Sequence, residues 1–154
     1  MESLLYKTIE HVKKTNPQLS VVDENYGQLD SLCSDNPDNM YPLTFPAVLI
    51  DLQETLWTTL TPSQQRGEAR INVQLIIDCY DDTHYGCGTM QAISQRAEMA
   101  ERLHGSLQGF QPWGGERMRR ESSKFYTARH GIKVYETVCV IRMSSTQSSN
   151  SEPA

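Results

Sequence analysis

The chain has 154 residues, 38% of them hydrophobic, and its four cysteines include no CxxC pair. This length suits one domain with a hydrophobic core and is short for two. No stretch approaches the roughly 20 apolar residues of a membrane span, and the first residues, MESLLYKTIEHVKK, lack the apolar core of a signal peptide. We therefore expect a soluble intracellular protein with free thiols.

The net charge of −5 conceals two segments of opposite sign. Residues 17–56 contain seven acidic side chains and no Lys or Arg, whereas residues 111–133 contain six basic side chains and two acidic ones. Such segments could pair within the fold, face different partners, or meet head to tail between identical subunits. The candidate interface residues are Asp23, Glu24, Asp35, Asp38, Arg66, Arg117, Arg119, Arg120, Lys124 and Arg129, together with Trp57 and Trp113, for which ordinary loop packing is an equal alternative.

The first part of the chain predicts one short helix and a long loop. Ser3 is a suitable N-cap, apolar residues follow at helical spacing, and Asn16-Pro17 ends the helix. A brief extended piece over residues 19–22 leads into a loop over residues 23–44 that is rich in Asp, Asn, Ser, Gly and Pro. Loops of this length in compact domains are usually functional or mobile.

Two strands follow. FPAVLIDLQE (residues 45–54) has a continuous apolar run, as expected for a strand covered on both faces. INVQLIIDCY (residues 71–80) alternates apolar and polar side chains, and only Ile76 breaks the alternation. Residues 55–68 between them are a long connection or, alternatively, an arm in which Leu56, Trp57 and Leu60 extend the strands outward.

The second half predicts a long helix and a last strand. Thr89 can cap a helix of about five turns with an apolar stripe from Met90 to Leu107, which Gly109 ends. Residues 109–132 show turn chemistry and little periodicity, and IKVYETVCVIRM is the final strand. We expect an α+β domain over residues 1–143, with a two-layer, mostly antiparallel sheet packed against the long helix, an additional N-terminal helix, and a disordered polar tail over residues 144–154.

The strongest candidate for chemistry is DCYDDTHYGC, where Cys79, His84 and Cys87 stand beside three carboxylates that zinc also accepts. Their spacing does not match closed zinc sites, and Cys79 continues the core-facing side of its strand. A structural turn is therefore favoured over a metal site. The chain contains no GxSxG, HExxH, GxGxxG or GxxxxGK[ST] motif, and its four histidines are scattered. No catalytic residue, cofactor or metal is expected.

The basic stretch ERMRRESSKFYTARHGIK has a nucleic-acid interpretation, because its Arg and Lys residues alternate with Phe125 and Tyr126, which could stack on bases. The alternative is a solvated loop whose charges offset the acidic segment. The second is favoured because a net acidic domain has no general attraction to nucleic acid.

The order of elements, with FPAVLID and INVQLIIDCYDD as its most telling pieces, resembles the tail terminator (tail completion) proteins of long-tailed bacteriophages, encoded by a phage or prophage. The resemblance covers residues 1–143. It implies a non-enzymatic subunit, made in the host cytoplasm, that forms a ring, commonly of six. The ring caps the tail tube at the virion neck, stops its polymerisation and joins tail to head.

The implied partners are the chain itself, the tail tube protein, a head connector or neck protein, and DNA in passing contact within the lumen, but no membrane. Loops 23–44 and 55–68 would serve as inter-subunit arms, and the basic loop 116–130 could face the tube, the neighbour or the DNA. The alternatives are a head-completion or neck connector subunit, a nucleic-acid-binding accessory protein and a small metal-dependent enzyme.

Overall fold

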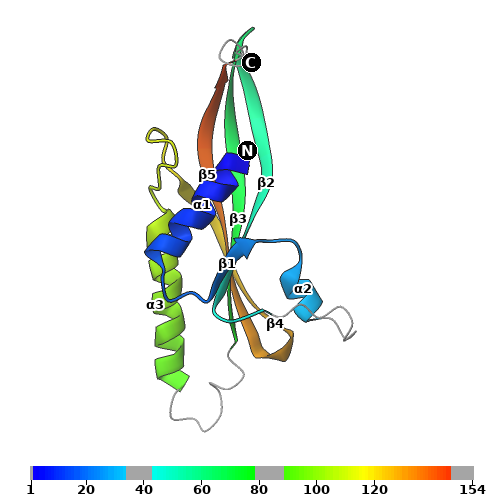
Figure 1. The fold of residues 1–154 in the computed structure, drawn as a ribbon, viewed down its shortest axis with the longest axis vertical. Helices are drawn as coiled ribbons and strands as arrows, with labels where there is room; N and C mark the ends of the chain where they lie inside the picture. The colour runs from blue at the N-terminus through cyan, green and yellow to red at the C-terminus, as the bar shows by residue number, and fades with distance from the viewer. Residues whose placement is uncertain (1, 34–42, 79–88, 147–154) are drawn as a thin grey trace.

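The computed structural model describes residues 2–33, 43–78 and 89–146. These residues form one five-stranded sheet with strand order β1-β2-β3-β5-β4 and several helices (Figure 1). Within them β1 and β2 pair in parallel, and the other three pairs are antiparallel. The predicted α+β class is confirmed. The elements are α1 (Glu2–Thr15), β1 (Val21–Glu24), α2 (Gln28–Leu32), β2 (Ala47–Thr61), β3 (Gln64–Asp78), α3 (Thr89–Leu107), β4 (Arg119–Ala128), the 3-10 turn η3 (Arg129–Gly131) and β5 (Ile132–Thr146).

The N-terminal helix α1 ends where the sequence predicts. Leu4, Leu5 and Val12 are buried at helical spacing against the sheet. The backbone N–H of Asn16 donates to the carbonyl of Val12 at 3.0 Å, and its side-chain amide donates to the same oxygen. The helix already includes Glu2, so Ser3 lies inside it and is not the N-cap.

The sheet has a hydrophobic core on each face, which explains both predicted strand patterns. Val48 and Ile50 of β2 face the larger core, which α1 and α3 cover, while Ala47 and Leu49 face a smaller core that includes Leu29 of α2. A strand covered on both faces needs a continuous apolar run. The alternation in β3 follows the same division: Ile71, Val73, Leu75 and Ile77 lie in the larger core, and Ile76 lies in the smaller one.

Helix α3 joins the core through its C-terminal half. Leu103 and Leu107 are buried in the larger core, whereas Met90 is 80% exposed and Ile93 is 45% exposed. The apolar stripe predicted along the whole helix is therefore only partly covered by the described residues. Gly109 ends the helix in a left-handed conformation with φ 82°, and its N–H donates to the carbonyl of Met118 at 2.7 Å.

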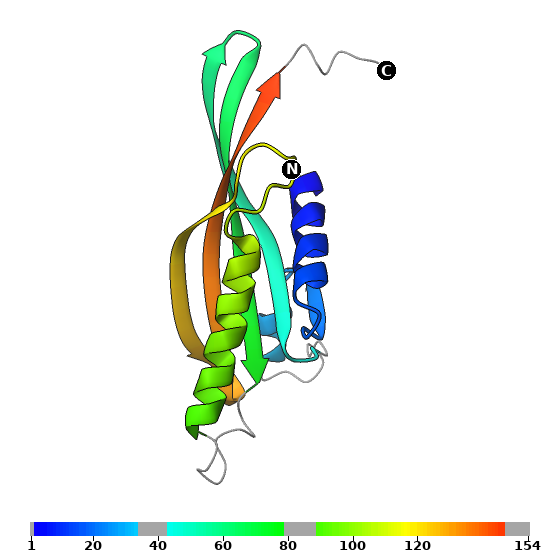
Figure 2. The ribbon, with the colours of Figure 1, turned by 90° about the vertical axis from the view of Figure 1, so that its left-hand side faces the viewer.

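Residues 55–61 and 64–68 belong to the strands β2 and β3, with only a turn at residues 62–63 between them, so the arm alternative is correct and the long connection is wrong. β2 and β3 each run for 15 residues, and β5 pairs with β3 as far as Thr146. The three strands project beyond the helices (Figures 1 and 2). We call residues 55–67 of the hairpin, with residues 143–146 of β5, the arm. Trp57 lies over Gly67, where an added Cβ would be 2.7 Å from the indole ring.

Two further predictions need correction. The basic segment 116–130, predicted as a loop, contains the ten-residue edge strand β4. Its side chains are almost all exposed and a register shift lies between Arg120 and Ser122, so the alternation that identifies a strand is missing. The predicted loop 23–44 contains the end of β1 and all of α2. β5 continues to Thr146, beyond the predicted boundary at 143, and residues 147–154 lie outside the described residues.

Candidate interaction surfaces

The two outermost strands of the sheet carry opposite charges. β1 contributes Asp23 and Glu24, and β4 contributes Arg119, Arg120 and Lys124. Three strands separate them, which at the usual spacing places the two edges about 19 Å apart. We call β1 with the following residues Asn25 and Tyr26 the acidic edge, and β4 the basic edge. The sheet thus keeps these charges from neutralising each other within the subunit.

Part of the charge on the basic edge is balanced by β3. The guanidinium of Arg70 donates two hydrogen bonds to the Glu121 carboxylate, at 3.0 and 2.7 Å. Arg119 Nη2 lies 3.2 Å from Glu68 Oε2. The hydrogen bonds from Arg70 hold the pKa of the Glu121 carboxyl below its usual value, although partial burial opposes the shift. These ion pairs connect β4 to β3 across β5, next to the register shift between Arg120 and Ser122.

The remaining basic candidates differ in how they are used. Arg117 donates to the carbonyl of Gly109 at 3.4 Å, and Arg129 donates to the carbonyl of Cys33 at 3.1 Å, so both bind backbone within the subunit. Arg120 faces the space between β4 and α3, and Lys124 Nζ lies 5.5 Å from the centre of the Tyr126 ring. Arg120 and Lys124 are therefore the basic-edge cations most available to a partner.

The other predicted interface residues lie apart from these. Trp57 and Arg66 lie on the two paired strands of the arm, where Trp57 is opposite Gly67 and Arg66 is opposite Thr58. Trp113 lies beside Arg142 and Met143 at a shallow hollow near the base of the arm. Trp57 and Trp113 are each a little over 40% exposed. Asp35 and Asp38 lie outside the described residues.

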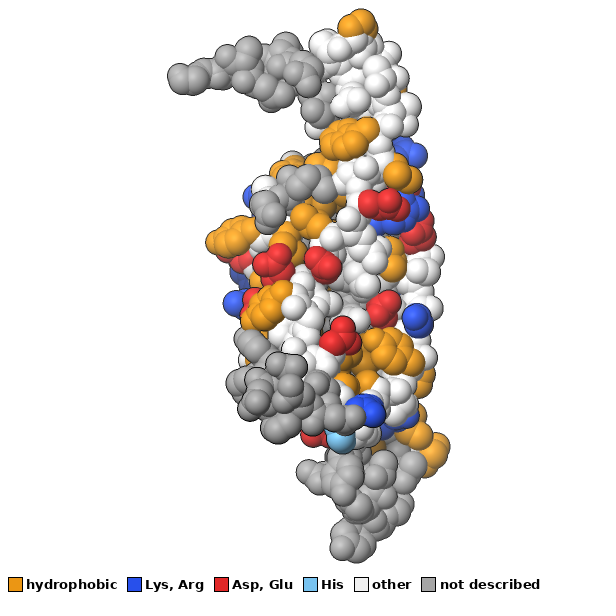
Figure 3. Space-filling view, turned by 90° about the vertical axis from the view of Figure 1, so that its right-hand side faces the viewer, with side chains coloured by type: hydrophobic (Ala, Val, Ile, Leu, Met, Phe, Trp, Pro, Cys, Tyr) orange, Lys and Arg blue, Asp and Glu red, His pale blue; other side chains and the backbone are white. Residues whose placement is uncertain are grey.

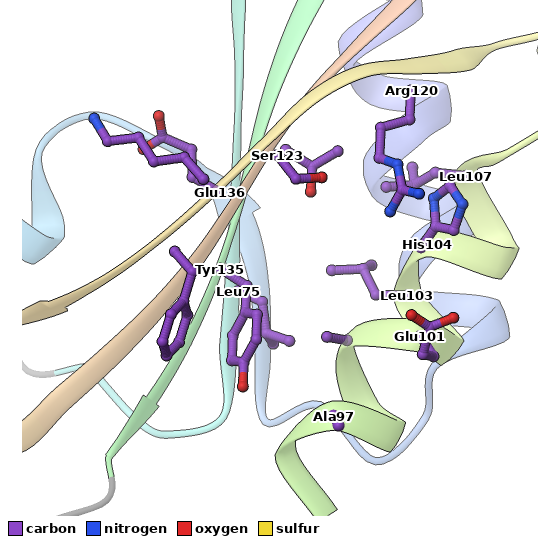
Figure 4. A pocket seen from close by; sticks show the side chains of 14 residues that line it. Leu75, Ala97, Glu101, Leu103, His104, Leu107, Arg120, Ser123, Tyr135 and Glu136 are labelled. Atoms are coloured by element: carbon purple, nitrogen blue, oxygen red, sulfur yellow. The ribbon is translucent and has the colours of Figure 1, made fainter. Parts of the chain in front are cut away.

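A groove lies between α3 and the β4–β5 side of the sheet, and no sequence pattern predicts it, because β4, which forms one of its sides, lacks the alternation of a strand. Its volume is about 290 Å³ (Figure 4). Leu75 and Tyr135 form its floor, and Phe125, 53% exposed, packs against Tyr135 with the two rings tilted and their centres 4.7 Å apart. The helix wall consists of Ala97, Ala100, Leu103 and Leu107, with Glu101 and His104, and Arg120 approaches from β4.

The opposite face of the sheet carries a polar cluster under α2. The Gln74 side-chain amide donates to Glu136 Oε1 at 2.9 Å and accepts a hydrogen bond from Asn25 at 3.3 Å. Burial raises the pKa of the nearby Tyr126 hydroxyl, and the Glu136 carboxylate raises it further. The cluster connects Asn25 of the acidic edge to Gln74 of β3 and Glu136 of β5.

Titratable side chains elsewhere have structural surroundings. Cys139 is buried, and burial raises the pKa of its thiol to about 11, against a lowering contribution from Arg120. His11 stacks on Phe110 and donates from Nε2 to the carbonyl of Ser106 at 2.7 Å. The described residues contain no group of three or more His, Cys, Asp or Glu side chains placed to hold a metal ion. Cys79, His84 and Cys87 lie outside them.

No helix in the described ranges is long and apolar enough to cross a membrane.

No protein-family model and no curated protein matches the chain. Among solved structures, the fold is similar to that of a chain in a structure titled "Virion of native gene transfer agent (GTA) particle", with a TM-score of 0.50 and 11% identity, over 91% of this chain and 91% of that chain. At this identity the likeness shows a shared fold, and it relates this fold to a component of a virion particle.

Proposed function

We propose that this chain is a non-enzymatic structural subunit of a phage-like virion, and specifically a tail terminator. Copies of it form a ring, of six in the family that the sequence resembles, which caps the tail tube, stops its polymerisation and joins it to the head. The observation that carries the proposal is the fold shared with a chain of a virion particle over 91% of both chains. The subunit is made in the host cytoplasm and resides at the neck of the virion.

The surfaces of the subunit support this role. A ring built from identical copies needs two different, complementary surfaces on each copy. The acidic and basic edges supply such a pair. The arm, with Leu56 and Leu60 about half exposed, supplies a third surface for the tail tube protein or the head connector.

Deleting the gene from the phage or prophage that encodes it tests this function directly. We expect tails of uncontrolled length and heads without tails, seen by electron microscopy of the lysate, with both defects corrected by expression of the intact chain. Tails of normal length that fail to join heads would instead support the head-completion or neck connector alternative. Normal joined virions would contradict both.

The nucleic-acid alternative has a separate test on the purified chain. It requires salt-dependent DNA retention that collapses when Arg117, Arg119 and Arg120 are replaced by Ala. We expect no such retention, because Arg119 is paired with Glu68 and Arg117 is bound to the carbonyl of Gly109.

The metal-dependent enzyme alternative is tested by native mass spectrometry. It requires one bound metal that is lost on Cys79→Ala or Cys87→Ser. A mass per subunit equal to that of the polypeptide alone, whatever the oligomeric state, would exclude it.

A further inference from the structure

The register of the sheet places the opposite charges of its two edges at the same height. Successive strand partners connect Asp23 to Lys124 through Leu49, Gln74 and Glu136. In the same way Glu24 is level with Ser123, through Ile50, Val73 and Thr137. A second copy displaced sideways, perpendicular to the strands, would therefore bring its Asp23 to the height of Lys124 on the first.

The acidic edge ends in an exposed aromatic side chain. Tyr26 lies two residues beyond the end of β1 and is 60% exposed, and the same segment carries the carboxylates of Asp23, Glu24 and Asp30. The N–H of Asn25 still donates to the carbonyl of Ile50 at 2.8 Å, so Tyr26 lies in the bend just beyond the β1–β2 pairing, toward the end of the sheet edge on which Arg120 lines the groove. Tyrosine is among the residues that most often anchor protein interfaces.

The groove beside the basic edge has the matching character. It is apolar at its floor and along the α3 wall, and its volume of about 290 Å³ suits a single large side chain rather than a helix. Arg120 and Lys124 are the cations of β4 at its margin, and the Glu101 carboxylate lies on the opposite, helical wall. The exposed Ile93 continues the same helix face beyond the groove.

The acidic edge of a subunit cannot fill the groove of the same subunit. Both belong to one continuous sheet, and β2, β3 and β5 stand between them (Figure 1). Any contact between these two surfaces must join two molecules. Such a contact is heterologous and closes into a ring when the rotation per copy permits.

We infer that the groove between α3 and β4 receives the acidic edge of a second copy of this chain, with Tyr26 entering the groove at its Arg120 end and Asp23 and Glu24 facing Lys124 and Arg120. The inference rests on the proposed function and assigns its ring contact. Backbone pairing contributes little to it, because β1 has only four residues and the N–H of Glu24 already donates to Asp23 Oδ1 at 2.8 Å. Side-chain packing and charge carry the contact.

The test is native mass spectrometry of the purified chain over a concentration series. Tyr26→Ser and Ala97→Arg should each weaken self-association at least about tenfold, since one removes the anchor and the other fills the groove. Tyr6→Ser and Gln95→Arg are the matched controls. They change an equally exposed tyrosine on α1 and a position on the opposite side of α3, and they should leave association unaltered.

Charge exchange and mixing make the test specific. Asp23→Lys and Lys124→Glu should each weaken association, because like charges then face each other, and the double variant should restore it. The Tyr26→Ser chain keeps its groove and the Ala97→Arg chain keeps its acidic edge, so a mixture should form one-to-one dimers and nothing larger. Circular dichroism checks that each variant is folded.

The outcomes separate this inference from the proposed function. A wild-type oligomer that Tyr26→Ser and Ala97→Arg both leave intact, or a charge exchange that fails to restore association, overturns the assigned contact and leaves the ring standing. A wild-type chain that stays monomeric throughout the series also overturns the contact. In each case the deletion phenotype still decides the proposed function.

Discussion

Cys139 provides a residue-level test of the larger core. Its thiol is buried on β5, and the raised pKa of about 11 leaves very little thiolate at neutral pH. We predict that iodoacetamide does not modify Cys139 in the folded chain and modifies it fully in denaturant, as read by peptide mass spectrometry. The half-buried Cys33 is the internal comparison. Rapid labelling of Cys139 under native conditions would show that β4 opens readily.

Glu121 is the residue whose titration should affect stability. The hydrogen bonds from Arg70 lower the pKa of its carboxyl from 4.5. The contribution of this pair to the free energy of unfolding is therefore fully present above pH 4.5 and is lost as the pH falls through the lower pKa of the folded state. We predict that Glu121→Gln lowers the melting temperature slightly at pH 7 and that the difference from wild type is lost as the pH falls below 4.5. The effect is small because the pair is solvent-screened. A difference that persists in acid would contradict this assignment.

At the same scale, the charges of the proposed contact are visible in the sequence, whereas its proposed anchor is not. The absence of Lys and Arg from residues 17–56 is visible without a structure, and it singled out Asp23 and Glu24. Tyr26 is one aromatic residue in a polar segment and generates no periodic signal. The match between Asp23 and Lys124 depends on four strand registers, which no local pattern encodes.

At the scale of elements, the arm depends on a close contact between its two long strands. An added Cβ at Gly67 would lie 2.7 Å from Trp57 Cζ3 and 2.9 Å from Thr55 Cγ2. We predict that Gly67→Ala displaces the indole and lowers the free energy of unfolding by about 1 to 3 kcal/mol, measured by urea denaturation.

Gly105→Ala is the matched control for that change. Gly105 lies in α3 with nothing within 4 Å of an added Cβ, so helix propensity should raise the stability by about 0.5 to 1 kcal/mol. Equal stability of the Gly67→Ala chain and the wild type would mean that Trp57 does not rest on β3.

The elements that the sequence predicted best are those with buried periodic faces. α1, α3 and the buried part of β3 each place apolar side chains at the spacing of their secondary structure. β4 and the arm have mostly exposed side chains, so composition there reflects solvent and partners instead of a core. These are also the elements that form the candidate surfaces, which explains why the groove could not be predicted.

At the scale of the whole molecule, the candidate surfaces point in different directions. The strands run along the long axis, so the sheet edges face sideways while the arm extends along the axis (Figure 1). Residues 55–65 contain no charged side chain, and the end of the molecule that holds the arm is largely uncharged in Figure 3. Lateral contacts between edges would therefore leave every arm free to meet a different partner on one face of the ring.

This separation predicts that self-association and joining can be uncoupled. Leu56→Ser with Leu60→Ser removes two exposed leucines from the arm and should change neither the unfolding free energy nor the native mass spectrum. In the deletion strain the same variant should fail to restore joined virions, because the apolar surface offered to the tube or the head is lost. Tyr6→Ser, which changes a residue outside all three surfaces, is the control and should restore joined virions fully. If the double leucine variant complements as well as the wild type, the arm is not the joining surface; if it dissociates the oligomer, the arm belongs to the ring contact instead of the acidic edge.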